Sequence, residues 1–258
     1  MKRSALVLSY LYAFLVLLFL YGPLLVMVLM GFNRSPLYEL PFQFDLIWFR
    51  KLLLNERLLI ATRNSVVLAI AVSIVSTSFG TLAAWALARY SFRGKNALQT
   101  MLIPPITIPW LILAVSMLLM FYWLNIPRSN LTIFIGHVGV ALPYVILVMI
   151  PRFQGLDRSL EEAARSLGAN PVVTFMRITL PLILPGLVAA AMFTFAVSFD
   201  NFTISHFLAP IGVSTLPVEI YSAIRKGFTP EINAISAIIF VFSATMILIS
   251  SREIKFIS

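Results

Sequence analysis

Residues 6–30 read LVLSYLYAFLVLLFLYGPLLVMVLM, a stretch without a single charged side chain. A helix that crosses the roughly 30 Å hydrocarbon core of a bilayer needs about 20 apolar residues, so this stretch is long enough to span a membrane, with Pro23 as a kink. Its apolar part is longer than the roughly 7–15 residues of a cleaved signal peptide. We therefore expect a retained transmembrane helix.

Five further apolar stretches bring the predicted number of membrane spans to six. They cover residues 64–88, 101–124, 131–150, 181–208 and 234–251. Pro104, Pro105 and Pro109 interrupt the first half of the third span, as happens where irregular backbone lines a cavity in a membrane protein. Together the spans predict an all-α integral membrane protein with one transmembrane domain over residues 1–258.

The composition agrees with lipid as the solvent for much of the chain. Hydrophobic residues make up 60% of the 258 residues and charged residues 11%, against about 25% charged in an ordinary globular protein. These values exclude a soluble enzyme, a disordered chain and a secreted disulfide scaffold. The absence of Cys also excludes thiolate metal sites and thiol nucleophiles.

The net charge of +9 is explained by topology. If the N-terminus is cytoplasmic, the inner segments are residues 1–5, 89–100, 151–179 and 252–258, which hold eleven Lys and Arg against four Asp and Glu. The inner side then has a net charge of +7 and the rest of the chain +2. Because Lys and Arg gather in cytoplasmic loops, we expect both termini in the cytoplasm and no nucleic-acid partner.

Residues 151–181, PRFQGLDRSLEEAARSLGANPVVTFMRITLP, predict a helical hairpin on the cytoplasmic side. Ser159 is expected to cap the first helix, with Glu162 completing a capping box. Gly168 supplies a left-handed C-cap, and Asn170-Pro171 starts a second helix over residues 172–178. The first helix would place four apolar side chains on one stripe: Leu160, Ala163, Ala164 and Leu167. An amphipathic helix resting on lipid headgroups is the alternative interpretation.

The hairpin carries a signature found in a known family. Glu162-Ala163-Ala164, Gly168, Ile178, Leu180 and Pro181 match the E-A-A-x3-G-x9-I-x-L-P motif of binding-protein-dependent ABC importer permeases at every spacing. The first cytoplasmic loop, 89-RYSFRGK-95, and the last outer loop, with 215-TLP-217 and 227-GFTPEINA-234, resemble the spermidine/putrescine-type permeases, most narrowly their second, C-type subunit. Nearly the whole chain is similar to that group.

The resemblance implies the type I ABC importer permease fold and a set of partners. The loop 151–180 would be the coupling loop, and Glu161, Glu162, Ala163, Ala164 and Gly168 its contacts with a separate ATPase subunit. The partners implied are a second homologous permease, two ATPase copies and a periplasmic or lipid-anchored solute-binding protein, in a bacterial inner membrane. ATP and Mg²⁺ would bind to the ATPase, so we expect this chain to be a non-catalytic subunit without a cofactor or metal.

Asp200 is a carboxylate within the predicted fifth span, and such a residue is by default a functional hypothesis because its charge is costly there. Phe193 and Thr203 would share its helix face, and a carboxylate beside an aromatic ring suits an ammonium group. Trp110 and Glu219 are further candidates for the solute pathway. Two other roles for Asp200 stay open: it could mark the end of the helix, or pair with a cation of the partner permease.

These observations favour import of a polyamine such as spermidine or putrescine. One departure from the polyamine-type permeases is Asn201, where several of them have a second acid. Import of another small solute, an organic amine or a phosphonate, is the alternative within the same machinery. An ion-coupled secondary transporter is a further alternative, although it gives no reason for the hairpin signature.

His137 in the fourth span is expected to form an interhelical hydrogen bond.

Overall fold

The computed structural model describes residues 2–36, 39–227 and 230–255, and the side chains of residues 6–36, 39–227 and 230–245. Phe228 and Thr229 of the last outer loop therefore lie outside the described residues, as do the side chains of the charged residues at both ends of the chain.

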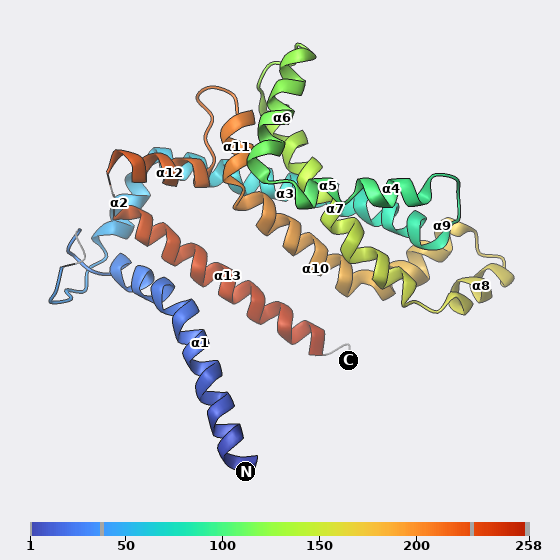
Figure 1. Cartoon of the computed structure of the whole chain (residues 1–258), viewed down its shortest axis with the longest axis horizontal. Coiled ribbons are helices and arrows are strands. Elements are labelled where there is room, and N and C mark those ends of the chain that lie inside the picture. Colours follow the sequence, from blue (N-terminus) through green and yellow to red (C-terminus); the bar gives the residue numbers. More distant parts are fainter. Residues whose placement is uncertain (1, 37–38, 228–229, 256–258) are drawn as a thin grey trace. The chain divides into compact units, whose positions relative to one another are not determined.

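The described part of the chain is helical, with no strand beyond an isolated bridge between Asn33 and Phe44 (Figure 1). A π-helix, Phe175–Thr179, joins α9 to α10. The α-helices are α1 (Lys2–Gly31), α2 (Ile47–Leu54), α3 (Glu56–Arg89), α4 (Lys95–Met101), α5 (Pro104–Thr107), α6 (Trp110–Trp123), α7 (Asn130–Gln154), α8 (Arg158–Ser166), α9 (Pro171–Thr174), α10 (Leu180–Phe199), α11 (Phe202–Leu208), α12 (Leu216–Lys226) and α13 (Glu231–Lys255). This confirms the all-α prediction.

Four helical runs are long and apolar enough to cross a membrane: Leu6–Gly31, Glu56–Arg89, Asn130–Gln154 and Pro171–Phe199. Leu6–Gly31, Glu56–Arg89 and Asn130–Gln154 contain the predicted spans 6–30, 64–88 and 131–150. The predicted sixth span, 234–251, lies within α13, but its apolar part among the described side chains, Glu231–Thr245, is shorter than a full span. Six spans thus stay a prediction, of which the structure shows four, or five if a broken helix is counted.

The broken helix is the predicted third span, residues 101–124. Lys95–Thr107 and Trp110–Trp123 meet at an angle of 109°. Ile108, between the two helices, has extended backbone, because the proline that follows it disfavours helical backbone at this position. The sequence expectation that the prolines break this segment is confirmed.

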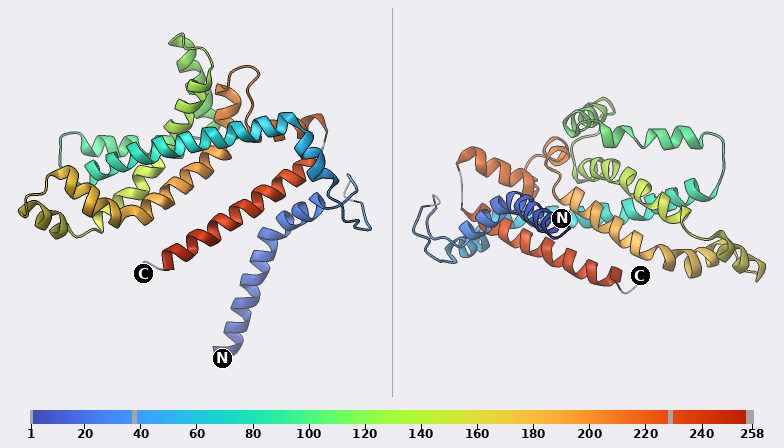
Figure 2. Two further views of the ribbon diagram at one scale, coloured as in Figure 1. Left: turned by 180° about the vertical axis from the view of Figure 1, so that it is seen from behind. Right: turned by 60° about the horizontal axis from the view of Figure 1, so that its bottom comes forward.

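The chain divides into two compact units. The first consists of Met1–Leu59 and Ile220–Ser258, in which α1 packs against α13, and α13 against α2. Figure 2 shows α1 and α13 close together at one end and diverging toward the two termini. Asn33 organises the loop between α1 and α2: its carbonyl accepts a hydrogen bond of 2.7 Å from Trp48 Nε1, and its Oδ1 accepts one from the Gln43 N–H.

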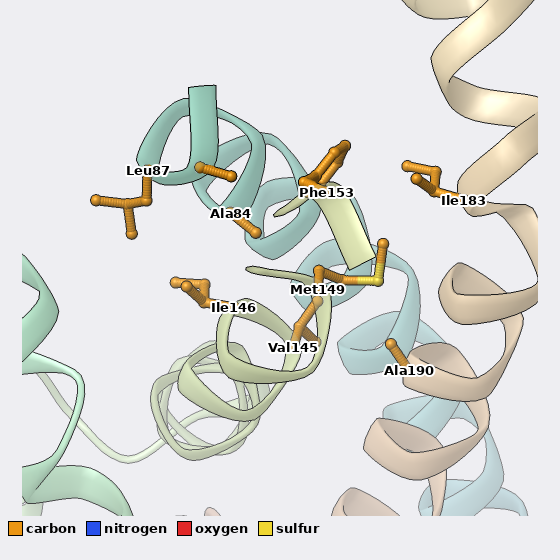
Figure 3. Close-up of a cluster of buried hydrophobic side chains, with 9 residues drawn as sticks. Ala84, Leu87, Val145, Ile146, Met149, Phe153, Ile183 and Ala190 are labelled. Atoms are coloured by element: carbon orange, nitrogen blue, oxygen red, sulfur yellow. The ribbon is translucent and has the colours of Figure 1, made fainter. Parts of the chain in front are cut away.

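The second unit, Ile60–Glu219, has its main core where α3, α7 and α10 meet (Figure 3). The labelled side chains in that core are Ala84, Leu87, Val145, Ile146, Met149, Phe153, Ile183 and Ala190. Another cluster joins α6, α7 and α11 through Ala114, Phe121, Ile133, Val140, Ile204 and Leu208. Whether the two units form the single domain predicted over residues 1–258 stays a prediction.

Small and hydroxyl-bearing residues bring the helices of the second unit together. A Cβ at Gly80 of α3 would lie 2.7 Å from Val145 Cβ of α7, so only glycine allows this approach. Between α3 and α10, Ser73 Oγ donates to the Ala191 carbonyl over 2.7 Å, and Thr194 Oγ1 donates to Ser73 Oγ over 3.3 Å. Such close packing and interhelical hydrogen bonds hold helices together in lipid, where no hydrophobic effect acts between them.

We predict that Gly80→Ala lowers the free energy of unfolding of the purified protein in detergent by about 1–3 kcal/mol, seen as a lower unfolding temperature. The reason is that Val145 Cβ is fixed to the α7 backbone and cannot move aside alone. Gly22→Ala in α1 is the control, since nothing lies within 4 Å of the added Cβ. Unchanged unfolding temperatures for both variants would contradict the close approach of α3 and α7.

Candidate functional site

The predicted hairpin is present, but its first helix begins differently from the prediction. Asp157, rather than Ser159, caps α8, and its carboxylate accepts a hydrogen bond of 2.9 Å from the Ser159 N–H. That hydrogen bond lowers the pKa of the Asp157 carboxyl group. The predicted capping box of Ser159 and Glu162 is therefore wrong. Asp157 lies one residue before the start of α8, and its carboxylate accepts from the free amide at the beginning of the helix in place of the Ser159 hydroxyl.

The turn after α8 follows the predicted chemistry. Gly168 has φ +86°, in the left-handed region, with open space around its Cα. Its N–H donates to the Arg165 carbonyl and the Ala169 N–H to the Ala164 carbonyl, the two hydrogen bonds of a Schellman motif. Asn170 then caps α9, accepting a hydrogen bond of 2.8 Å from the Val173 N–H. The left-handed C-cap at Gly168 and the helix start at Asn170 are confirmed.

The second helix of the hairpin does not end at residue 178. It continues through the π-helix into α10, so the helical run extends over Pro171–Phe199. The predicted boundary relied on Pro181, whose ring clashes with the carbonyl of Arg177 in regular α-helix. The wider π-helical turn of Phe175–Thr179 includes that residue, which explains how the helix passes the proline.

The hairpin exposes apolar side chains on its surface. Leu160, Ala163 and Leu167 of the predicted stripe are exposed, whereas Ala164 is buried. Leu167 has the largest exposed fraction of these, 89%, and Val172 and Met176 on the second helix are exposed as well. In Figure 1, α8 and α9 lie at one end of the second unit. This is a surface that a partner with an apolar cleft can cover.

The two glutamates of the hairpin face different surroundings. Glu162 is exposed, and no ion pair holds it among the side chains that the structure describes. Glu161 Oε1 forms an ion pair of 3.2 Å with Arg89 at the end of α3 and accepts a hydrogen bond of 3.1 Å from Thr179. Glu161, predicted as a contact with the ATPase, is thus occupied within the chain.

The second candidate region is an elbow between α10 and α11. The predicted span 181–208 is wrong at both ends, since the helix begins earlier and stops at Phe199. Asp200 is the C-cap of α10, and Asn201 is the N-cap of α11, its side chain accepting a hydrogen bond of 2.9 Å from the Ile204 N–H. Because the helix breaks here, Thr203 does not share a continuous helix face with Asp200 and Phe193.

His137 of α7 bridges the elbow. Its Nδ1 lies 2.8 Å from Ser198 Oγ near the end of α10, and its Nε2 lies 3.0 Å from Ser205 Oγ on α11. All three side chains are buried. The expected interhelical hydrogen bond of His137 is confirmed, and it is doubled.

The structure places the remaining pathway candidates on separate elements. Asp200 is exposed and Thr203 is half-buried, on either side of the helix break. Phe193 is exposed over 45% of its surface and contacts the Tyr144 ring, with centroids 5.4 Å apart. Trp110 packs against the cluster of α6, α7 and α11, and Glu219 lies in the first turn of α12. Within the described residues, no hydrogen bond or ion pair joins these five side chains to one another.

Sequence reasoning missed three residues that shape these regions. Arg89 entered only as part of the basic first cytoplasmic loop, without a predicted partner, and no role was predicted for Ser198 or Ser205. A basic residue that ends a span offers no sign of its partner, and serines in a transmembrane helix are common packing residues. Their roles depend on which helix lies opposite.

For metal binding, the described residues contain no group of three or more His, Asp or Glu side chains that could hold an ion.

Comparison with known proteins identifies the family. The model of the binding-protein-dependent transport system inner membrane component matches residues 76–257. The chain belongs to this family. The spermidine/putrescine transport system permease protein PotC of Haemophilus influenzae is 35% identical over 240 residues, which cover 93% of each chain. The putrescine transport system permease protein PotI of Escherichia coli is 36% identical over 228 residues, which cover 86% of this chain and 81% of that one.

Solved structures show the same fold for this inner membrane component. A chain from a bacterial ABC transporter involved in the import of the acidic polysaccharide alginate matches 100% of this chain and 97% of its own, with a TM-score of 0.73 at 17% identity. A chain of the methionine ABC transporter MetNI matches 77% of this chain and 96% of its own, with a TM-score of 0.57 at 20% identity. The predicted type I importer fold and family membership are thereby confirmed.

We predict that His137→Phe lowers the free energy of unfolding of the purified protein in detergent by about 1–3 kcal/mol, seen as a lower unfolding temperature. The reason is that Ser198 and Ser205 are then buried without their histidine partner. Adding Ser198→Ala and Ser205→Ala to that variant should recover most of the loss, since no unpaired hydroxyl remains. His206→Phe, at an exposed position, is the control. A triple variant no more stable than His137→Phe would argue against the bridge.

Proposed function

We propose that this chain is one of two transmembrane subunits of an ATP-driven importer of polyamines such as spermidine or putrescine. The observation that carries the proposal is the surface hairpin. It has the family's E-A-A and glycine signature at every spacing, the left-handed turn at Gly168, and exposed apolar side chains beside Glu162. Such a surface suits docking into a cleft of a separate ATPase.

The hairpin is where ATP would act on this subunit. ATP can drive transport only by favouring one conformation over another, so closure of the ATPases must displace something that the spans follow. Here the second helix of the hairpin is continuous with the transmembrane helix ending at Phe199. A displacement of Gly168 and its neighbours would therefore reach the Asp200 elbow along one helical run.

The remaining partners belong to the same proposal. The chain would pair with a second homologous permease in a bacterial inner membrane, with both termini cytoplasmic. A periplasmic or lipid-anchored solute-binding protein would deliver the solute. A solved structure with a similar fold is the bacterial alginate ABC transporter in complex with an alginate pentasaccharide-bound periplasmic protein. ATP and Mg²⁺ would bind to the ATPase subunits, so this chain would be a non-catalytic subunit without its own cofactor or metal.

Two observations support a cationic solute. PotC of Haemophilus influenzae, PotI of Escherichia coli and PotC of Escherichia coli each match more than four fifths of the chain, and they are permeases of spermidine/putrescine or putrescine transport systems. Asp200 supplies an exposed carboxylate at the elbow, and Phe193 an exposed aromatic ring seven residues before it. Carboxylates and aromatic faces are the groups that bind ammonium ions. Trp110, Thr203 and Glu219 are proposed as further contacts along the pathway.

We predict that Gly168→Pro abolishes ATPase binding and uptake while membrane insertion stays normal, because proline cannot adopt φ +86°. Gly212→Pro is the matched control: that glycine has φ +87° and equally open surroundings, but lies outside the hairpin. Co-purification of the ATPase with each variant is the measurement. Glu162→Lys should likewise abolish uptake and ATPase stimulation. Normal coupled transport in the Gly168 variant would contradict the docking role.

We predict that Asp200→Asn lowers uptake of a polyamine roughly tenfold or more, since a charged hydrogen bond contributes about 1.5–3 kcal/mol. The measurement is uptake of radiolabelled spermidine and putrescine by cells or proteoliposomes. Asp45→Asn, in the loop before α2, is the control for loss of a carboxylate elsewhere. An unaltered uptake rate in the Asp200 variant would mean that this carboxylate only ends the helix.

A further inference from the structure

Three helical segments meet at the Glu161 carboxylate. Arg89 Nη2, at the end of α3, lies 3.2 Å from Glu161 Oε1, and Thr179 Oγ1, at the end of the π-helix before α10, donates to the same oxygen over 3.1 Å. Arg89 Nη2 also lies 3.4 Å from the Leu156 carbonyl, just before α8. We call Arg89, Glu161 and Thr179 the latch.

The latch is shielded from water. The side chains of Arg89 and Glu161 are 7% and 12% exposed, and Thr179 is buried. Arg89 and Glu161 form the one ion pair among the side chains that the structure describes. Exposed ion pairs contribute little because water and salt screen them, whereas a buried pair depends strongly on keeping both partners. A change in the position of α8 would therefore act on α3 through the ion pair of Glu161 with Arg89.

Aromatic packing supports the latch from one turn away. Trp85 precedes Arg89 by one turn of α3, and Phe175 precedes Thr179 in the π-helix. Their rings contact each other with centroids 5.1 Å apart, and Tyr90 packs edge-on against Trp85 at 5.7 Å. The end of α3 and the start of the α10 run are thus joined by the Trp85–Phe175 contact as well as through Glu161.

Without the latch, α8 would contact mainly the chain that follows it. α8 packs against α9 and the π-helix, which belong to the same continuous run as α10. The ion pair of Glu161 with Arg89 joins α8 to α3. A cavity of about 120 Å³, lined by both members of the pair and by Glu162, lies beside it and leaves room for the pair to change geometry.

We propose that Glu161 is a positioning residue that transmits displacement of the hairpin to α3 and α10 through the latch, while its neighbour Glu162 faces the ATPase. The inference rests on the proposed function. It replaces the expectation that Glu161 contacts the ATPase itself, because Glu161 Oε1 already accepts from Arg89 and Thr179. Networks of hydrogen bonds and ion pairs between packed helices can carry coupling between two sites.

The test uses charge reversal in the complete complex of both permeases, the ATPases and the binding protein, reconstituted in proteoliposomes. We expect Glu161→Arg and Arg89→Glu each to lower the solute transported per ATP hydrolysed about tenfold, within the usual range of coupling between sites, with the ATPase still bound. The double variant restores the ion pair in reverse, so its ratio should return to within about threefold of the original. Glu162→Arg, the matched control, should weaken ATPase binding and should not be rescued by Arg89→Glu.

A neutral pair of variants covers the case in which charge reversal prevents assembly. Thr179→Val removes one hydrogen bond to Glu161, whereas Thr174→Val removes a hydrogen bond to the helix's own backbone, at Asn170. The former should lower the transport-to-ATP ratio and the latter should not. Equal ratios for these two variants, or loss of ATPase binding by Glu161→Arg without rescue by Arg89→Glu, would overturn the latch. If the unaltered complex shows no ATP-driven uptake, the proposed function is wrong, and the coupling role proposed for the latch is then wrong as well.

Discussion

Hydrocarbon offers no hydrogen bonds to the backbone, and the structure follows from this constraint. Each helical break must satisfy its freed amides and carbonyls from within the protein. At the elbow after Phe199, Asn201 caps the following helix, and His137 joins the two flanking helices through Ser198 and Ser205. The irregular segment is thereby made stable enough to hold an acidic residue, Asp200, beside it.

The same constraint explains the contrast between the elbow and the hairpin. Outside the spans, water can hydrate helix ends, and local side chains suffice: Asp157 and Asn170 cap the two helices, and Gly168 makes the turn between them. The polar contacts of the hairpin that reach further are those of Arg89, Glu161 and Thr179. They connect a water-exposed surface element to helices that enter the membrane, which is what coupling to an ATPase requires.

Local sequence predicted much of both regions. The caps at Asn170 and Gly168 and the break near Pro109 follow from side chains and backbone preferences within a few residues, and all three are observed. The Ser159 cap failed because Asp157, two residues earlier, competes for the same amides. The end of the fifth span was misplaced because Asp200 and Asn201 stand in an apolar run whose hydropathy does not reveal a change of direction.

The sequence by itself determined that the chain is helical and lies in a membrane, that residues 151–180 form a hairpin, and that the hairpin has the signature of an importer permease. These properties depend on composition, on side chains close along the chain and on fixed motif spacings. Only the tertiary structure decided that Glu161 turns inward to Arg89 while Glu162 stays exposed, and that His137 holds Ser198 and Ser205. Those pairs are separated by 61 to 72 residues, so they exist only after α3, α7, α8, α10 and α11 have packed together.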